Sequence, residues 1–67
     1  MNRDQLVRAL RRYARARELP FKVETKRGKG SHYRVRVGDR VTTIQKDLTP
    51  GRIERALKQL NVNLGDL

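Results

Sequence analysis

Cysteine is absent from the chain, so a disulfide framework and a zinc site built on cysteine thiolates are both excluded. Long hydrophobic runs are absent as well, and charges begin at the third residue of the opening stretch MNRDQLVRAL. A signal peptide and a membrane span each need an unbroken apolar stretch, and neither is expected here. We therefore expect a cytoplasmic protein that does not contact a membrane and is held together by hydrophobic packing.

Acidic residues are few: the 67-residue chain has 7 Asp and Glu against 17 Lys and Arg, a formal net charge of +10. Such a balance favours a polyanion as the partner, because each phosphate that a basic side chain neutralises releases counterions. Ribosomal, DNA-binding and RNA-processing roles all fit. The length predicts a single domain, residues 1–67, with a thin core, since a domain of this size buries only about 60% of the surface that its unfolded chain exposes.

Aromatic residues are scarce too, with two tyrosines, one phenylalanine and no tryptophan. Tyr13, Phe21 and Tyr33 each fall on the apolar side of a predicted helix or strand, which favours core packing over base stacking. Proteins that read RNA on an RRM-like or OB-like sheet need exposed rings on that sheet. The sequence argues against both classes.

The first amphipathic segment is predicted to be a helix over residues 3–18. Asn2 is a good N-cap, and Gln5, three residues later, completes a capping box. Pro20 cannot continue a helix, so the helix ends before it. The apolar positions share one side of this helix and predict its core-facing surface. The other side carries four arginines, which are Arg8, Arg11, Arg12 and Arg15.

A second helix is predicted to begin at Pro50, directly after the N-cap Thr49, and to end near Asn61. Its apolar residues recur at helical spacing. The tail that follows, NVNLGDL, is too short to form an element of its own, and its leucines predict that it folds back on the core.

Three segments between the helices alternate between apolar and polar residues, as half-buried strands do: residues 21–26, 32–37 and 40–45. The dipeptide Gly38-Asp39 predicts a two-residue hairpin turn of type II′. The inward pairs are then Val37 with Arg40, Val35 with Thr42, and Tyr33 with Ile44. The outward pairs are Arg36 with Val41, Arg34 with Thr43, and His32 with Gln45.

The element order predicts an α+β fold in which a helix, a three-stranded antiparallel sheet and a second helix follow one another as α-β-β-β-α. Each helix has one apolar face to cover, and placing both helices on one face of the sheet covers both. The other sheet face would stay in water. We expect it to carry the only histidine, two arginines and a threonine.

His32 is the candidate catalytic residue. A lone histidine is more often an ordinary surface residue, and that interpretation stays open. The neighbours of His32 favour a functional role for it. It follows a basic Gly-Lys-Gly-Ser loop, and we expect it to share a face with Arg34, Arg36 and Thr43. Histidine can take or give a proton near neutral pH, and cations can hold a phosphodiester beside it.

Each basic feature also has a simpler interpretation. Alternating arginines on a strand can be a solvated surface that discourages aggregation, and the arginine side of the first helix can be solvated or can bind phosphate. The loop around Gly28 and Gly30 can be a permissive turn. A nucleotide-binding P-loop is not indicated there, because a strand follows the loop instead of a helix.

Two runs, GKGSHYRVRVGDRVTTIQ and LTPGRIERALKQLNV, resemble the HicA toxins of bacterial type II toxin–antitoxin systems. The shared features are a Gly-Ser-His segment at the second strand, a Gly-containing hairpin followed by a basic residue, and a closing helix that begins near TPG and ends in LKQL. The resemblance spans nearly the whole chain. Many members have a second histidine where this chain has Tyr33, to which we assign no catalytic role.

The resemblance implies a fold like that of double-stranded-RNA-binding domains. It also implies the activity of a ribosome-independent mRNA interferase, an endoribonuclease toxin, that a HicB-like antitoxin protein neutralises by covering the active site. The family's catalytic histidine corresponds to His32. The RNA-binding residues that we assign beside it are Lys29, Arg34, Arg36, Arg27 and Thr43. The partners are then mRNA and the antitoxin, and we expect no metal ion and no other cofactor.

The alternative is a non-catalytic basic RNA-binding module with the same fold. Such domains commonly place a lysine cluster at the start of the last helix. This chain has Pro50, Gly51, Arg52 and Ile53 there, so the lysine cluster is missing. A ribosome-associated basic protein would also fit the charge, although it gives no reason for a histidine on the basic face.

Overall fold

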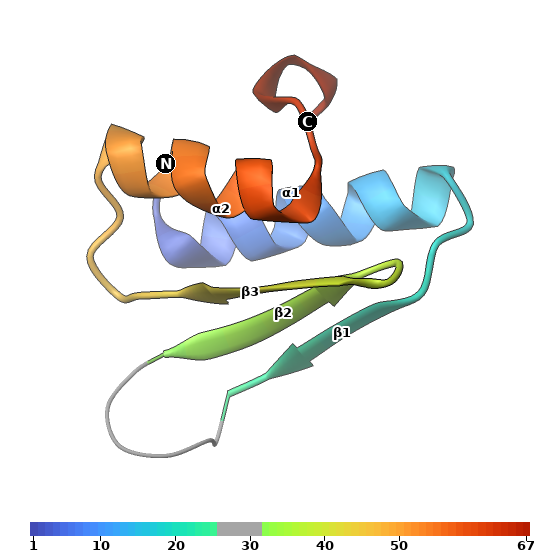
Figure 1. Cartoon of the computed structure of the whole chain (residues 1–67), viewed down its shortest axis with the longest axis horizontal. Helices are drawn as coiled ribbons and strands as arrows, with labels where there is room; N and C mark the ends of the chain where they lie inside the picture. The colour runs from blue at the N-terminus through green and yellow to red at the C-terminus, as the bar shows by residue number, and fades with distance from the viewer. Residues whose placement is uncertain (26–31) are drawn as a thin grey trace.

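The computed structural model describes residues 1–25 and 32–67. Both helices lie over the same face of a three-stranded antiparallel sheet (Figure 1). In chain order the elements are α1 (Arg3–Ala16), β1 (Phe21–Glu24), β2 (Tyr33–Val37), β3 (Arg40–Ile44), α2 (Pro50–Leu60) and the short 3₁₀-helix η1 (Leu64–Asp66). The order α-β-β-β-α and the packing of the helices on the sheet confirm the predicted fold class.

Helix α1 begins where the sequence predicts but ends earlier. The capping box is present: the N–H of Gln5 donates to Oδ1 of Asn2 at 2.8 Å, and the N–H of Asn2 donates to Oε1 of Gln5 at 2.9 Å. Glu18, predicted to be the last helical residue, instead has a φ of +55°. The N–H of Leu19 donates back to the C=O of Ala14 at 2.8 Å, so a left-handed turn closes the helix before Glu18.

Helix α2 has the predicted boundaries. Oγ1 of Thr49 accepts a hydrogen bond from the N–H of Arg52 at 3.2 Å, which confirms Thr49 as the N-cap. Asn61 ends the helix in the left-handed conformation, with a φ of 58°. No helix in the described part of the chain is long and apolar enough to cross a membrane.

The sheet has the order β1-β2-β3, and the register between β2 and β3 is the predicted one. The cross-strand pairs are Tyr33 with Ile44, Arg34 with Thr43, Val35 with Thr42, Arg36 with Val41, and Val37 with Arg40. Gly38 has a φ of +65°, whereas Asp39 is not among the residues with positive φ. This is the sign combination of the predicted type II′ turn.

Strand β1 is shorter than its alternation predicts, because it ends at Glu24. Thr25 lies outside the ladder, and Lys26 lies outside the described residues. The register with β2 pairs Phe21 with Val37 and Glu24 with Arg34 at the two ends of the strand.

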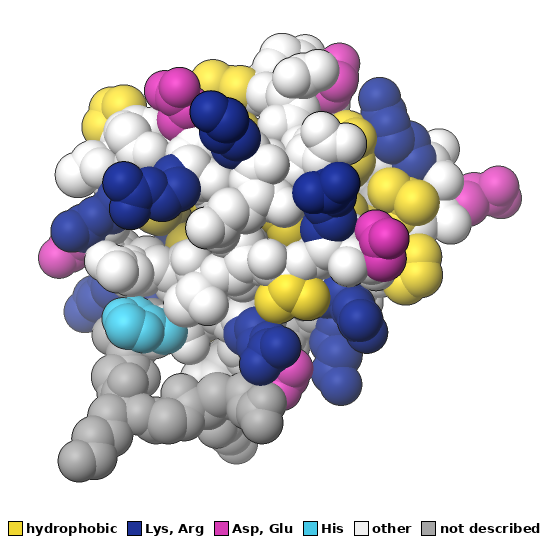
Figure 2. Space-filling view, in the orientation of Figure 1, with side chains coloured by type: hydrophobic (Ala, Val, Ile, Leu, Met, Phe, Trp, Pro, Cys, Tyr) yellow, Lys and Arg dark blue, Asp and Glu magenta, His cyan; other side chains and the backbone are white. Residues whose placement is uncertain are grey.

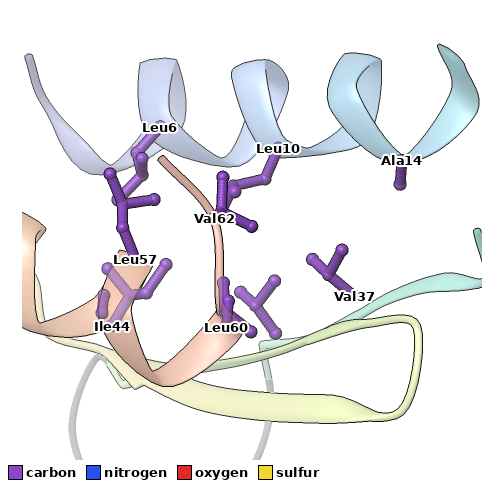
Figure 3. Packing of buried hydrophobic residues seen from close by; sticks show 10 residues of the cluster. Leu6, Leu10, Ala14, Val37, Ile44, Leu57, Leu60 and Val62 are labelled. Carbon is purple, nitrogen blue, oxygen red and sulfur yellow. The ribbon is translucent and has the colours of Figure 1, made fainter. Parts of the chain in front are cut away.

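The hydrophobic core lies between α1, α2 and the inner face of the sheet (Figure 3). Its buried members are Leu6, Leu10, Ala14, Val35, Val37, Ile44, Ala56, Leu57, Leu60 and Val62. The tail folds back on this core only in part as predicted: Leu67 packs against the cluster, whereas Leu64 is exposed. Val62 is buried between Leu10 and Leu60 (Figure 3). The expectation that the tail has no element is wrong, because Leu64–Asp66 form η1.

Candidate nucleic-acid interface

The face of the sheet opposite the helices, called the open sheet face below, carries the polar residues of the alternating pattern. Its side chains are Lys22 and Glu24 on β1, Arg34 and Arg36 on β2, and Val41 and Thr43 on β3. A shallow depression of about 140 Å³ lies on this face, lined by all of these residues except Thr43. The parity that the sequence predicts therefore holds: Arg34, Arg36 and Thr43 are exposed.

His32 is exposed at the residue just before β2. Its predicted pairing with Gln45 is wrong, because the ladder stops at Tyr33 and Ile44. The chain bends after Gln45 toward α2, and the C=O of Asp47 accepts a hydrogen bond from Nη1 of Arg52 at 2.8 Å. The imidazole makes no hydrogen bond to another described residue and lies at the molecular surface (Figure 2).

Two residues assigned to RNA binding from the sequence, Arg27 and Lys29, lie outside the described residues. Of the assigned residues, the structure describes His32, Arg34, Arg36 and Thr43; Arg34 and Thr43 are paired across β2 and β3, whereas His32 lies just outside the ladder. The side chains of Arg34 and Arg36 follow His32 at alternate positions of the chain, so they continue along β2 from its start.

Glu24 is an acidic member of the open sheet face that the sequence analysis did not assign to it. It lies opposite Arg34 across the pairing of β1 with β2, and Lys22 lies opposite Arg36. The alternation of residues 21–26 already pointed Lys22 and Glu24 outward, so this signal was available. Glu24 lowers the positive charge at the end of the face near His32, while the other end keeps two cations.

A groove of about 440 Å³ runs between β3 and α2. The strand contributes Val41, Thr42, Thr43 and Ile44, the helix contributes Arg52, Arg55, Ala56 and Gln59, and the remaining lining residues are Arg34, Gln45 and Leu48. Arg52 and Arg55 were not assigned from the sequence. Their spacing places them on one face of a helix, but only the packing of α2 shows that this face borders β3.

Each of the three aromatic rings is half-buried against the core and lies beside an arginine. The guanidinium carbon of Arg3 lies 3.6 Å from the ring centroid of Tyr33, and that of Arg17 lies 4.2 Å from the centroid of Tyr13. Tyr33 was predicted to be buried, but it is only partly so, and the guanidinium of Arg3 lies over its ring. None of the rings belongs to the open sheet face, so that face offers no aromatic stacking platform for bases.

Comparisons of the chain with protein-family models, with curated proteins and with solved structures give no match.

Proposed function

We propose that the protein is an RNA-cleaving toxin, an mRNA interferase of a HicAB-like toxin–antitoxin system, in which His32 transfers a proton during cleavage. One observation carries the proposal: the only histidine is exposed at the start of the central strand, whose outward side chains are Arg34 and Arg36. A proton carrier that precedes two exposed cations in the sequence suits a phosphodiester substrate.

The reaction would be attack of an RNA 2′-hydroxyl on its own adjacent phosphorus. The new bond joins O2′ to phosphorus, the bond from phosphorus to O5′ breaks, and the products carry a 2′,3′-cyclic phosphate and a 5′-hydroxyl. His32 either removes the proton of the 2′-hydroxyl or gives a proton to the leaving O5′. A single imidazole serves one of these steps in a turnover, so water or a lysine serves the other, and we expect a slow enzyme.

Arg34 and Arg36 would stabilise the negative charge that builds on the phosphoryl oxygens, because a guanidinium donates two parallel N–H groups to oxyanions. Thr43, opposite Arg34 on β3, adds a hydroxyl to the same face. Lys29 and Arg27 are proposed to hold the RNA from the loop before His32. Exposure of the described members supports these roles, since each can reach a substrate without any change in the core.

The proposed protein partner is a HicB-like antitoxin that covers the open sheet face. A cover for a basic face needs acidic side chains, and charge complementarity would speed the encounter as well as hold the complex. Reversing the charge of Arg34 and Arg36 to glutamate should therefore slow association with a cognate antitoxin. An unchanged association rate would show that the antitoxin binds elsewhere.

The test is incubation of the purified wild type and of a His32→Ala variant with a single-stranded transcript, followed by mapping of the RNA ends. We expect new ends with cyclic phosphate from the wild type only. Equal cleavage by both proteins would remove His32 from the mechanism. A transcript that binds the wild type without acquiring new ends would instead identify the non-catalytic RNA-binding module.

A further inference from the structure

The groove between β3 and α2 follows the backbone edge of β3. Its lining includes Thr42 and Ile44, whose side chains are buried in the core, together with Val41 and Thr43, whose side chains point the other way. Successive side chains of a strand project to opposite faces of a sheet. A cavity that touches four successive residues must therefore run along the edge of the strand, where its main chain is accessible.

The register shows which main-chain groups point into this groove. The two-residue turn makes Val37 and Arg40 a hydrogen-bonded pair, and hydrogen-bonded pairs then recur at every second residue. Val41 and Thr43 are in the alternate set, so their N–H and C=O groups point away from β2. No hydrogen bond between described residues engages these groups. The edge thus presents two donors and two acceptors in alternation.

From Val41 to Ile44, the edge of β3 has no proline, charged side chain or bulge, which are features that protect sheet edges from pairing with another strand. Its register with β2 is continuous over all five residues, and the four from Val41 to Ile44 are uncharged and contain no proline. The opposite edge differs, because β1 has four residues, follows Pro20, and carries Lys22 and Glu24. Of the two edges, β3 is the one suited to accept a further strand.

The charge of the groove selects the kind of strand. Three arginines, Arg34, Arg52 and Arg55, belong to its lining, and no acidic residue does so among the described residues. Nη1 of Arg52 is fixed by its hydrogen bond to the C=O of Asp47, which leaves other N–H groups of the guanidinium available. Guanidinium groups bind carboxylates through paired hydrogen bonds. Figure 2 shows dark blue basic side chains spread among white polar and main-chain atoms on the face that it draws.

Two other occupants fit less well. The phosphates of an RNA strand only accept hydrogen bonds, so phosphates placed along this edge would leave the outward C=O groups of Val41 and Thr43 facing negative charge. A second copy of this chain would bring another net charge of +10 and arginines against arginines. A peptide strand supplies donors and acceptors in the same alternation as the edge itself.

We infer that the β3–α2 groove is a docking site for an extended acidic segment of a partner protein, which adds as a fourth strand beside β3 and places carboxylates on Arg34, Arg52 and Arg55. The inference goes beyond the proposed function, because docking needs no RNA and no cleavage. It also concerns a surface distinct from His32, although Arg34 borders both.

The test uses an extended octapeptide of alternating glutamate and valine as the probe, and amide hydrogen exchange of the full chain as the readout. On binding, exchange of the Val41 and Thr43 amides should slow by about tenfold or more, because both become hydrogen-bonded donors. Arg52→Gln combined with Arg55→Gln should weaken binding by about tenfold or more. The matched control, Arg12→Gln with Arg15→Gln on α1, removes the same charge and should leave binding within about twofold.

A second variant separates pairing at the edge from attraction by charge. Val41→Pro removes an outward N–H that the β2–β3 ladder does not use, so the fold should persist while the peptide no longer docks. Retained docking by this variant, unchanged exchange at Val41 and Thr43, or equal weakening by both arginine pairs would overturn the inference. So would protection of the same amides by an octauridylate RNA in place of the peptide, or a wild-type dimer paired through β3.

Discussion

Thr42, buried on the inner side of β3, donates a hydrogen bond from Oγ1 to Oε1 of Gln59 on α2. This bond joins the edge strand to the helix that packs over it, and it satisfies the one polar side chain that is buried in the described part of the chain. Gln59 itself is exposed. Water can therefore replace the bond for the amide of Gln59 but not for the buried hydroxyl of Thr42.

Removing Gln59 should cost more stability than removing the hydroxyl of Thr42. Gln59→Leu leaves a buried hydroxyl without its partner, and we expect a loss of about 1 to 3 kcal/mol. Thr42→Val leaves an amide that water can reach, so its effect should stay within about 1 kcal/mol. Urea denaturation of both variants and of the double variant measures this. A larger loss for Thr42→Val would contradict the asymmetry.

His32→Ala should reduce the rate of RNA cleavage by about two to four orders of magnitude, the usual contribution of one acid–base group. Stability in urea should be unchanged, because the side chain is exposed and makes no hydrogen bond to another described residue. His32→Gln keeps much of the shape without proton transfer, so it should be equally slow. A glutamine variant that cleaves at the wild-type rate would end the acid–base assignment.

RNA binding should weaken steeply with salt, and the arginines of the open sheet face should account for part of this dependence. On single strands each phosphate contact contributes about 0.7 to the slope of log affinity against log salt, so Arg34→Gln with Arg36→Gln should lower the slope by about 1.4. Binding isotherms at several salt concentrations measure it. Arg12→Gln with Arg15→Gln is the charge-matched control on α1. An equal reduction by the control would place phosphate contacts on the helix instead.

Glu18→Gly should stabilise the protein. Glu18 has a φ of +55°, a conformation that costs a residue with a side chain about 1 to 2 kcal/mol, whereas glycine loses about 0.4 to 1 kcal/mol through the greater freedom of the unfolded chain. The net gain should be about 1 kcal/mol in thermal or urea unfolding. Arg12→Gly, in the exposed middle of α1, should instead cost about 1 kcal/mol. Destabilisation by both changes would show that Glu18 is held by contacts of its side chain.

Helix starts and one strand register followed from the sequence by itself. The caps at Asn2 and Thr49 are hydrogen bonds between residues three apart, so the local sequence contains both partners. The register of β2 and β3 was predictable because a two-residue turn at Gly38 leaves only one alignment. Exposure of Arg34 and Arg36 then followed from parity, whereas His32 is exposed just before the strand begins.

Helix and strand ends were less predictable, because they depend on backbone conformations that no residue signals. Glu18 adopts a left-handed conformation that usually requires glycine or asparagine, so the end of α1 was placed too late. At the other helix, Asn61 suits that conformation, and the predicted end was correct. A helix end is therefore predictable from the sequence where the residue that adopts the left-handed conformation is of a type that favours it.

Only the tertiary structure decided which charges meet. Residues 25–32 separate β1 from β2 along the chain, so the local sequence does not fix Glu24 opposite Arg34. Arg52 and Arg55 share a face of α2 by their spacing, but burial of Ala56, Leu57 and Leu60 rotates that helix so that the arginines border the edge of β3. Caps and turns act between neighbours in sequence, whereas the groove and the acid on the open sheet face arise from contacts between distant segments that the core brings together.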